Sequence, residues 1–172
     1  MKPPDSHYFF IFDKVKAALL VAVICLFSTF SNHSALAQSP IRISEVVSDN
    51  KSGISDPDGK KSDWFEIQNI SEKSIQLSDY GVSDHLSQKD IWRLPNKQLP
   101  PGDCLIFFAN GKKTNAPFKL SAQGESLWIF KFEKNREQSK WIKISHFHFP
   151  DMDEDQAYGY SKSGLPGYLE LP

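Results

Sequence analysis

The feature that most constrains this fold is a succession of short β-type segments, separated by turn residues, with no sustained helical periodicity from Gln38 to Pro172. Seven or eight short strands at this spacing predict an all-β domain, either a β-sandwich or a barrel. The candidates for these strands are nine segments, of which 75–82 is either a short strand or a corner: residues 41–47, 63–70, 75–82, 91–94, 104–109, 118–120, 126–132, 141–149 and 157–161.

Alternation within the segment 63–70 predicts which side chains enter the core. Phe65 and Ile67 fall on one face of that strand, and Glu66 and Gln68 fall on the other. The segment 104–109 is apolar on both faces, so we expect a central strand there. The residues that we expect to define the core are Phe65, Ile67, Trp92, Leu105 and Phe107.

The N-terminal segment has the composition of a secretory signal peptide. Lys14 and Lys16 precede an apolar run over residues 17–30, and small residues follow up to Ala37. The run has 14 residues, which is short of the roughly 20 that span a bilayer. We predict cleavage between Ala37 and Gln38, which N-terminal sequencing of the exported protein would detect, and no stable membrane span after removal. Retention as an uncleaved anchor is the alternative.

We therefore divide the chain into a signal peptide at 1–37, a short lead at 38–40, a domain at 41–161 and a C-terminal tail at 162–172. Cleavage would leave a single cysteine, Cys104, in an apolar run, where a buried and inert thiol is expected. The 20 basic and 21 acidic residues give a net charge of -1. This balance excludes a general electrostatic binder of nucleic acid, which needs a basic surface.

A series of motifs in a fixed order connects the chain to a known family. The motifs are Ile43-x-Glu45-Val46, Asp63-Trp64-Phe65-Glu66-Ile67-x-Asn69, Leu77-x-x-Tyr80-Gly81-Val82-x-Asp84, Trp92-Arg93-Leu94-Pro95, Leu99-Pro100-x-Gly102-x-Cys104-Leu105-Ile106, Phe118-x-Leu120-x-x-x-Gly124-x-x-Leu127 and Tyr158-Gly159-Tyr160. In these motifs the chain resembles the lamin tail domain in its bacterial, secreted form. The resemblance covers about residues 41–161. It departs at Gly159-Tyr160, where family members commonly have Gly-Arg.

This resemblance implies an immunoglobulin-like β-sandwich and an interaction module without catalytic activity. Bacterial domains of this type are similar to accessory domains found beside secreted or surface enzymes and adhesins. The filament function of nuclear members is not expected to transfer, because fold alone does not imply function.

Two acidic segments are candidate cation sites. Asp56 and Asp58 lie in a polar loop, with Asp63 just beyond it, and hard cations such as Ca²⁺ bind several oxygen ligands. Lys60 and Lys61 occupy positions that an EF-hand would give to a ligand and a glycine, so weak Ca²⁺ binding is the most we expect, and a solvated turn is the alternative. The run 151–155 contains four further carboxylates, which suit cations or a basic partner.

His146 and His148 share one face of a predicted strand and precede the acidic run, which permits a metal site. Packing or edge positions are the more common role of such histidines. The four tryptophans provide either a platform for sugars or peptides or ordinary sheet packing. They are Trp64, Trp92, Trp128 and Trp141.

The sequence therefore predicts a secreted or periplasmic binding module, without a cofactor, whose partner is a protein or polysaccharide of the cell envelope or surface. One alternative is a small metal-dependent hydrolase or nuclease that uses His146 and His148. The other is a structural envelope protein with no discrete ligand.

Overall fold

The computed structural model describes residues 39–161 and 163–169, so the predicted signal peptide and the Ala37–Gln38 cleavage site lie outside the described residues. Eleven strands, two 3-10 turns and no α-helix make up the described chain. The elements are β1 (Ile41–Val47), β2 (Trp64–Asn69), β3 (Ile75–Gln76), η1 (Leu77–Asp79), β4 (Tyr80–Ser83), η2 (Gln88–Asp90), β5 (Trp92–Arg93), β6 (Gln98–Leu99), β7 (Cys104–Phe108), β8 (Glu125–Lys134), β9 (Ser139–Phe149), β10 (Ala157–Tyr160) and β11 (Pro166–Leu169).

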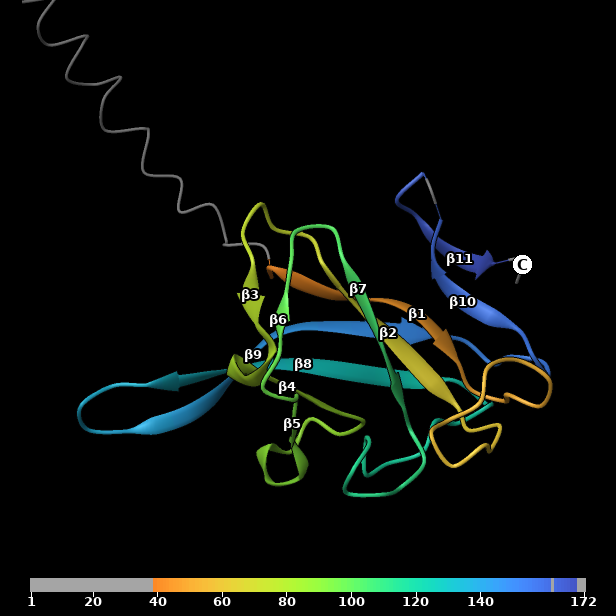
Figure 1. Cartoon of the computed structure of the whole chain (residues 1–172), viewed down its shortest axis with the longest axis horizontal. Helices are drawn as coiled ribbons and strands as arrows, with labels where there is room; N and C mark the ends of the chain where they lie inside the picture. Colours follow the sequence, from red (N-terminus) through yellow and green to blue (C-terminus); the bar gives the residue numbers. More distant parts are fainter. Residues whose placement is uncertain (1–38, 162, 170–172) are drawn as a thin grey trace, which may run out of the picture. The chain divides into compact units, whose positions relative to one another are not determined.

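Two antiparallel sheets form the layers of a β-sandwich (Figure 1). One sheet has the order β11-β10-β1-β2-β7, and the other has the order β5-β4-β8-β9. The short strands β3 and β6 pair with each other at one end. The predicted all-β, immunoglobulin-like sandwich is confirmed.

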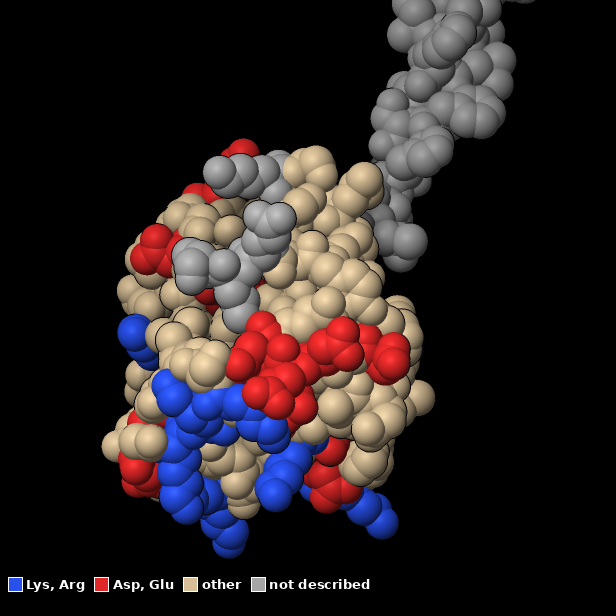
Figure 2. Space-filling model, turned by 90° about the vertical axis from the view of Figure 1, so that its right-hand side faces the viewer, with Lys and Arg blue, Asp and Glu red and all other residues tan. Residues whose placement is uncertain are grey.

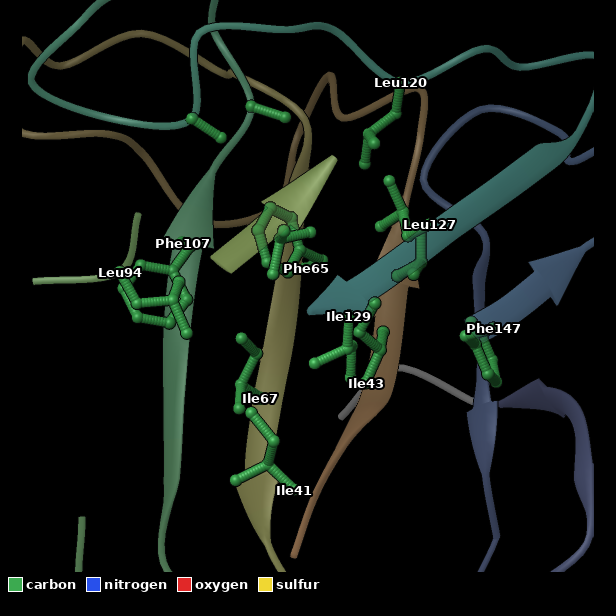
Figure 3. Packing of buried hydrophobic residues seen from close by; sticks show 14 of the residues in the cluster. Ile41, Ile43, Phe65, Ile67, Leu94, Phe107, Leu120, Leu127, Ile129 and Phe147 are labelled. Carbon is green, nitrogen blue, oxygen red and sulfur yellow. The ribbon is translucent and has the colours of Figure 1, made fainter. Parts of the chain in front are cut away.

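The core lies between the inner faces of the two sheets (Figure 3). Ile43 and Ile67 from the five-stranded sheet face Leu127 and Ile129 from β8, and none of the four has any exposed area. Burial of each such side chain contributes about 1.5–3 kcal/mol. The sandwich therefore depends on this layer for its stability.

The residues expected to define the core divide into two groups. Phe65, Ile67 and Phe107 are buried, with Phe65 at 5.7 Å from the Phe107 ring centroid. Trp92 and Leu105 are partly exposed and pack against the same cluster, and the Trp92 and Phe107 rings form a T-shaped pair with centroids 5.4 Å apart. The inward direction of Phe65 and Ile67, with Glu66 and Gln68 outward, agrees with the predicted alternation.

The prediction that strand 104–109 is central is wrong, because β7 is the edge of the five-stranded sheet. Its apolar residues serve two different clusters: Phe107 faces the core, and Phe108 packs outward beside Trp64. Cys104 is exposed rather than buried. Partial desolvation and the neighbouring Glu66 carboxylate nevertheless raise the pKa of the Cys104 thiol to about 11, which disfavours the reactive thiolate.

Two other segments differ from prediction. The segment expected to be a C-terminal tail contains β11, which pairs with β10 from Ala157↔Leu169 to Tyr160↔Pro166 and widens the sheet. The segment 118–120 is not a strand, although Phe118 and Leu120 are buried as loop residues. The hairpin β8–β9 is longer than expected and extends beyond the sandwich (Figure 1).

Candidate functional site

The two candidate histidines lie on the outer face of the four-stranded sheet. Phe147 and Phe149 of β9 are buried in the core, so strand alternation turns His146 and His148 outward, and both are exposed. Nδ1 of His148 lies 3.2 Å from the hydroxyl of Ser126. Ile142 and Ile144 have the same period-two spacing as the histidines, but the register shifts between Ile129 and Phe130 on the partner strand β8, so that Ile142 pairs with Lys131 and Ile144 packs against the core.

Aromatic side chains alternate along β8 on this outer face. Leu127 and Ile129 point into the core, so Trp128, Phe130 and Phe132 point outward. From Trp128 to Phe132 the row extends about 13 Å, at about 3.3 Å per residue. The pairing partners on β9 are His146 opposite Trp128, Lys143 opposite Phe130 and Trp141 opposite Phe132.

We call this surface the aromatic–basic face. It consists of Arg93, Trp128, Phe130, Phe132, Trp141, Lys143 and His146.

At one end of the aromatic–basic face, two cationic or ionisable groups flank one indole. The His146 ring stacks on Trp128 with centroids 4.8 Å apart and an interplanar angle of 25°. Nζ of Lys143 lies 4.9 Å from the Trp128 centroid, within cation–π range. Trp128 therefore contacts both neighbours and remains partly exposed.

The other end repeats this arrangement with arginine. The Arg93 guanidinium lies 4.5 Å from the Phe132 ring centroid and 5.8 Å from that of Trp141. The Phe132 and Trp141 rings are themselves 5.0 Å apart. Arg93 Nε donates a 2.6 Å hydrogen bond to the Ser78 carbonyl, which fixes the guanidinium over the rings.

Gly81 allows this face to close over Phe130. A Cβ at Gly81 would lie 2.4 Å from Cγ2 of Ile91 and 3.1 Å from the Trp141 ring, so only glycine leaves room for both. Phe130 is 1% exposed although it points away from the core. The outer face is thus a packed layer of its own.

Within the described residues, no carboxylate lies within ion-pair distance of the nitrogen-bearing side chains of the aromatic–basic face. Among residues 39–161 and 163–169, the ion pairs within 4.0 Å are Lys51–Asp49, His85–Asp84 and Lys112–Asp58. None of these involves Arg93, Lys143 or His146.

The Lamin Tail Domain family profile matches residues 34–156, which is more than half of the chain. The chain belongs to this family. The resemblance seen in the sequence motifs is therefore confirmed. No curated protein and no solved structure matches the chain. In the described part of this lamin tail domain, no helix has the length and apolar character needed to cross a membrane.

Asp56, a predicted cation ligand, is an internal hydrogen-bond acceptor in this lamin tail domain. Its Oδ1 accepts from the backbone N–H groups of Asp58 and Lys60, at 2.9 and 3.0 Å. Its Oδ2 accepts from the Ser62 hydroxyl and the Asn110 amide, at 2.8 and 3.0 Å. These donors, led by Lys60 N–H, hold the pKa of Asp56 at about 2. A cation would have to displace them.

The two other loop carboxylates do not converge with Asp56. Asp58 pairs with Lys112. Asp63 accepts a 3.3 Å bond from Asn50 N–H, and its partial burial raises its pKa. Over the described residues, no three His, Cys, Asp or Glu side chains gather as a metal-binding group.

The second acidic run, residues 151–155, is bonded through Asp155 to the loop that contains Lys51 and Ser52. These loops lie at the end of the domain that Figure 2 shows, where basic side chains gather beside acidic ones. Asp155, with a positive φ of 58°, accepts the N–H groups of Lys51 and Ser52 at 2.7 and 2.9 Å. The Ser52 hydroxyl donates at 2.6 Å. Chiefly because of the Ser52 donors, the pKa of Asp155 falls to about 2.

The four tryptophans separate into two roles. Trp64 is 7% exposed in a small cluster with Val47 and Ala157, and Trp92 faces the core. Trp128 and Trp141 stand on the outer face, where a platform had been considered. Sequence reasoning missed Arg93 and Lys143, because nothing in their local sequence places them over rings of a neighbouring strand.

Proposed function

We propose that this lamin tail domain is an exported, non-catalytic module that binds a polysaccharide of the cell envelope or surface on its aromatic–basic face. The observation that carries the proposal is a pair of partly exposed ring clusters on the outer sheet face, Trp128 with His146 and Phe132 with Trp141, which lie about 13 Å apart on either side of the buried Phe130. Aromatic residues with a polar edge are common in ligand recognition, because they combine apolar area with directed contacts.

The composition of the face favours a sugar polymer over a protein partner. Lysine is depleted in protein interfaces, whereas here an exposed lysine, Lys143, lies over the Trp128 ring at one end of the row. The large hydrophobic side chains that are exposed in the described chain lie elsewhere. They are Ile54, Leu86, Ile106, Leu165 and Tyr168.

Export is supported by the apolar run at 17–30 and the small residues up to Ala37. The destination is the periplasm or the exterior. A non-catalytic role is supported by the separate contacts of the titratable side chains that were candidates for catalysis. His146 stacks on a ring, His148 lies beside Ser126, and Asp56 accepts hydrogen bonds from its own loop. A hydrolase would need such groups directed at one reacting point.

Retention on native envelope material tests the proposal. The purified domain is mixed with the insoluble envelope fraction of its own cell, and the bound fraction is measured by sedimentation. We expect wild type to sediment and the double variant Trp128→Ala/Trp141→Ala to stay in solution. Tyr168→Ala removes an exposed ring from the other sheet and should sediment like wild type. Melting curves verify that each variant is folded.

Equal sedimentation of the folded double variant and wild type would contradict the proposal. If the double variant does not fold, the single variants Trp128→Ala and Trp141→Ala provide the same comparison one ring at a time, because each ring is only partly buried.

A further inference from the structure

We infer that the polysaccharide is acidic, with carboxylate or sulfate groups on its sugar units, and that Arg93, Lys143 and His146 contact those anionic groups. This inference rests on the proposed function and specifies its ligand class. It follows from the charge of the outward-facing positions and from the geometry of the cations over the rings.

The outward strand positions of the four-stranded sheet include basic residues and no acidic ones; Asp84 and Asp90, which line one depression with Arg93, lie between β4 and β5. Strand alternation and register place a consistent set of residues on this face. On β5, β8 and β9 the set contains Arg93, Ser126, Trp128, Phe130, Phe132, Lys134, Ser139, Trp141, Lys143, His146 and His148, and it includes no Asp or Glu. A neutral sugar polymer would gain nothing from this imbalance, whereas an acidic polymer matches it.

The basic residues at the end of the domain shown in Figure 2 contact carboxylates or carbonyl oxygens of the protein. Lys112 pairs with Asp58, and Lys51 pairs with Asp49 at 2.6 Å. Lys61 Nζ donates to the carbonyls of Ser52 and Gly53. These lysines are used within the protein. The cations of the aromatic–basic face contact rings instead, and a ring does not consume their hydrogen-bond donors.

The donors that remain are suited to an anion on a sugar. Arg93 uses Nε for the Ser78 carbonyl, so its two terminal nitrogens remain for a bidentate contact with a carboxylate. Lys143 has three N–H donors on a side chain that reaches over Trp128. The partly exposed rings of Trp128, Phe132 and Trp141 provide apolar contact for the C–H groups of a sugar. The pairing of one ring with one cation recurs at both ends of the row.

Binding to defined polymers tests the inference. The probes are polygalacturonate, dextran sulfate, uncharged dextran and single-stranded DNA, each titrated with the full domain at one ionic strength. We expect binding to the two acidic polysaccharides and none to dextran. Lys143→Gln and Arg93→Gln should each weaken that binding about tenfold, as loss of one charge-assisted contact implies. Added salt should weaken it further.

Lys140→Gln is the matched control. Lys140 is exposed on the same strand and lies on the opposite side of the alternation, across from Glu133. The Lys140→Gln substitution removes one positive charge, as Lys143→Gln does, and leaves the aromatic–basic face unchanged. Binding by Lys140→Gln should equal that of wild type, so a shared loss in both lysine variants would indicate general charge attraction and would overturn the inference.

The outcomes separate this inference from the proposed function. Two results would overturn the acidic ligand while the binding function stands. One is binding to dextran as tight as binding to polygalacturonate. The other is envelope sedimentation that is abolished in Trp128→Ala/Trp141→Ala and unchanged in Lys143→Gln. Tighter binding to single-stranded DNA than to either acidic polysaccharide also overturns it. If face variants change neither polymer binding nor sedimentation, both proposals fail.

Discussion

Replacing Gly159 by alanine should separate β10 from β1. Gly159 pairs with Glu45 on one side and with Gly167 on the other. A Cβ at Gly159 would lie 2.3 Å from the Ser44 carbonyl oxygen and 2.9 Å from Cα of Glu45, and both atoms belong to the backbone. Neither atom can move without shifting strand β1.

The size of the effect follows from these distances. A carbon and a carbonyl oxygen in contact are normally about 3.3 Å apart, so the strands must separate by about 1 Å. Ladder bonds of about 2.9 Å would then be lost, each contributing about 0.5–1.5 kcal/mol. Overpacking of this kind costs about 1–3 kcal/mol. We expect a loss of about 2–3 kcal/mol, which lowers Tm by roughly 6–15 °C in a domain of this size.

Gly167→Ala is the matched control, because it changes the paired glycine on β11. A Cβ there meets nothing within 4 Å, so its Tm should remain within about 3 °C of wild type. Thermal unfolding followed by circular dichroism, with urea unfolding at 25 °C, measures both variants. Equal Tm values for Gly159→Ala and Gly167→Ala would refute the close approach of β10 to β1.

Three further predictions concern the core, pH and calcium. Phe65→Asp and Ile67→Asp should unfold the domain while Gln68→Asp stays folded, because a buried unpaired carboxylate costs several kcal/mol of a free energy of unfolding of about 5–15 kcal/mol. Similar thermal melts for all three variants would be inconsistent with the inward direction of Phe65 and Ile67. The folded pKa values of Asp56 and Asp155 fall from 3.8 to about 2, so their stabilisation is complete above about pH 4 and disappears as pH decreases toward 2; urea unfolding should show a weaker pH dependence in Asp155→Asn than in wild type. Melts in about 1 mM Ca²⁺ and in chelator should nearly coincide, because a millimolar site stabilises by only about 0.4 kcal/mol; a large upward shift would reveal a calcium-dependent module.

Local pattern was sufficient for most strands of the sandwich. The β-branched segment 41–47 is strand β1, and the alternation in 63–70 gave the inward direction of Phe65 and Ile67. Period-two alternation reports which side of a strand faces apolar surroundings, and it needs no knowledge of the partner strand. The same logic failed for β7, because apolar residues on both faces are equally compatible with an edge strand beside a second cluster.

The candidate site shows the same limit more sharply. The acidic segments were conspicuous in the sequence, yet Asp56 and Asp155 accept hydrogen bonds that hold their own loops. Hydrogen-bond donors from Asn110, and from Lys51 and Ser52, come from distant positions in the chain. A list of carboxylates cannot reveal whether their oxygens are already used.

The sequence by itself determined the all-β class, the family and the alternation that turns Trp128 and Phe132 to one side of β8, because these depend on residue type and local spacing. Only the tertiary structure decided that Arg93 lies over Phe132 and that Lys143 lies over Trp128. Strand register between segments far apart in the chain brings these groups together, and register depends on the packing of the whole sandwich.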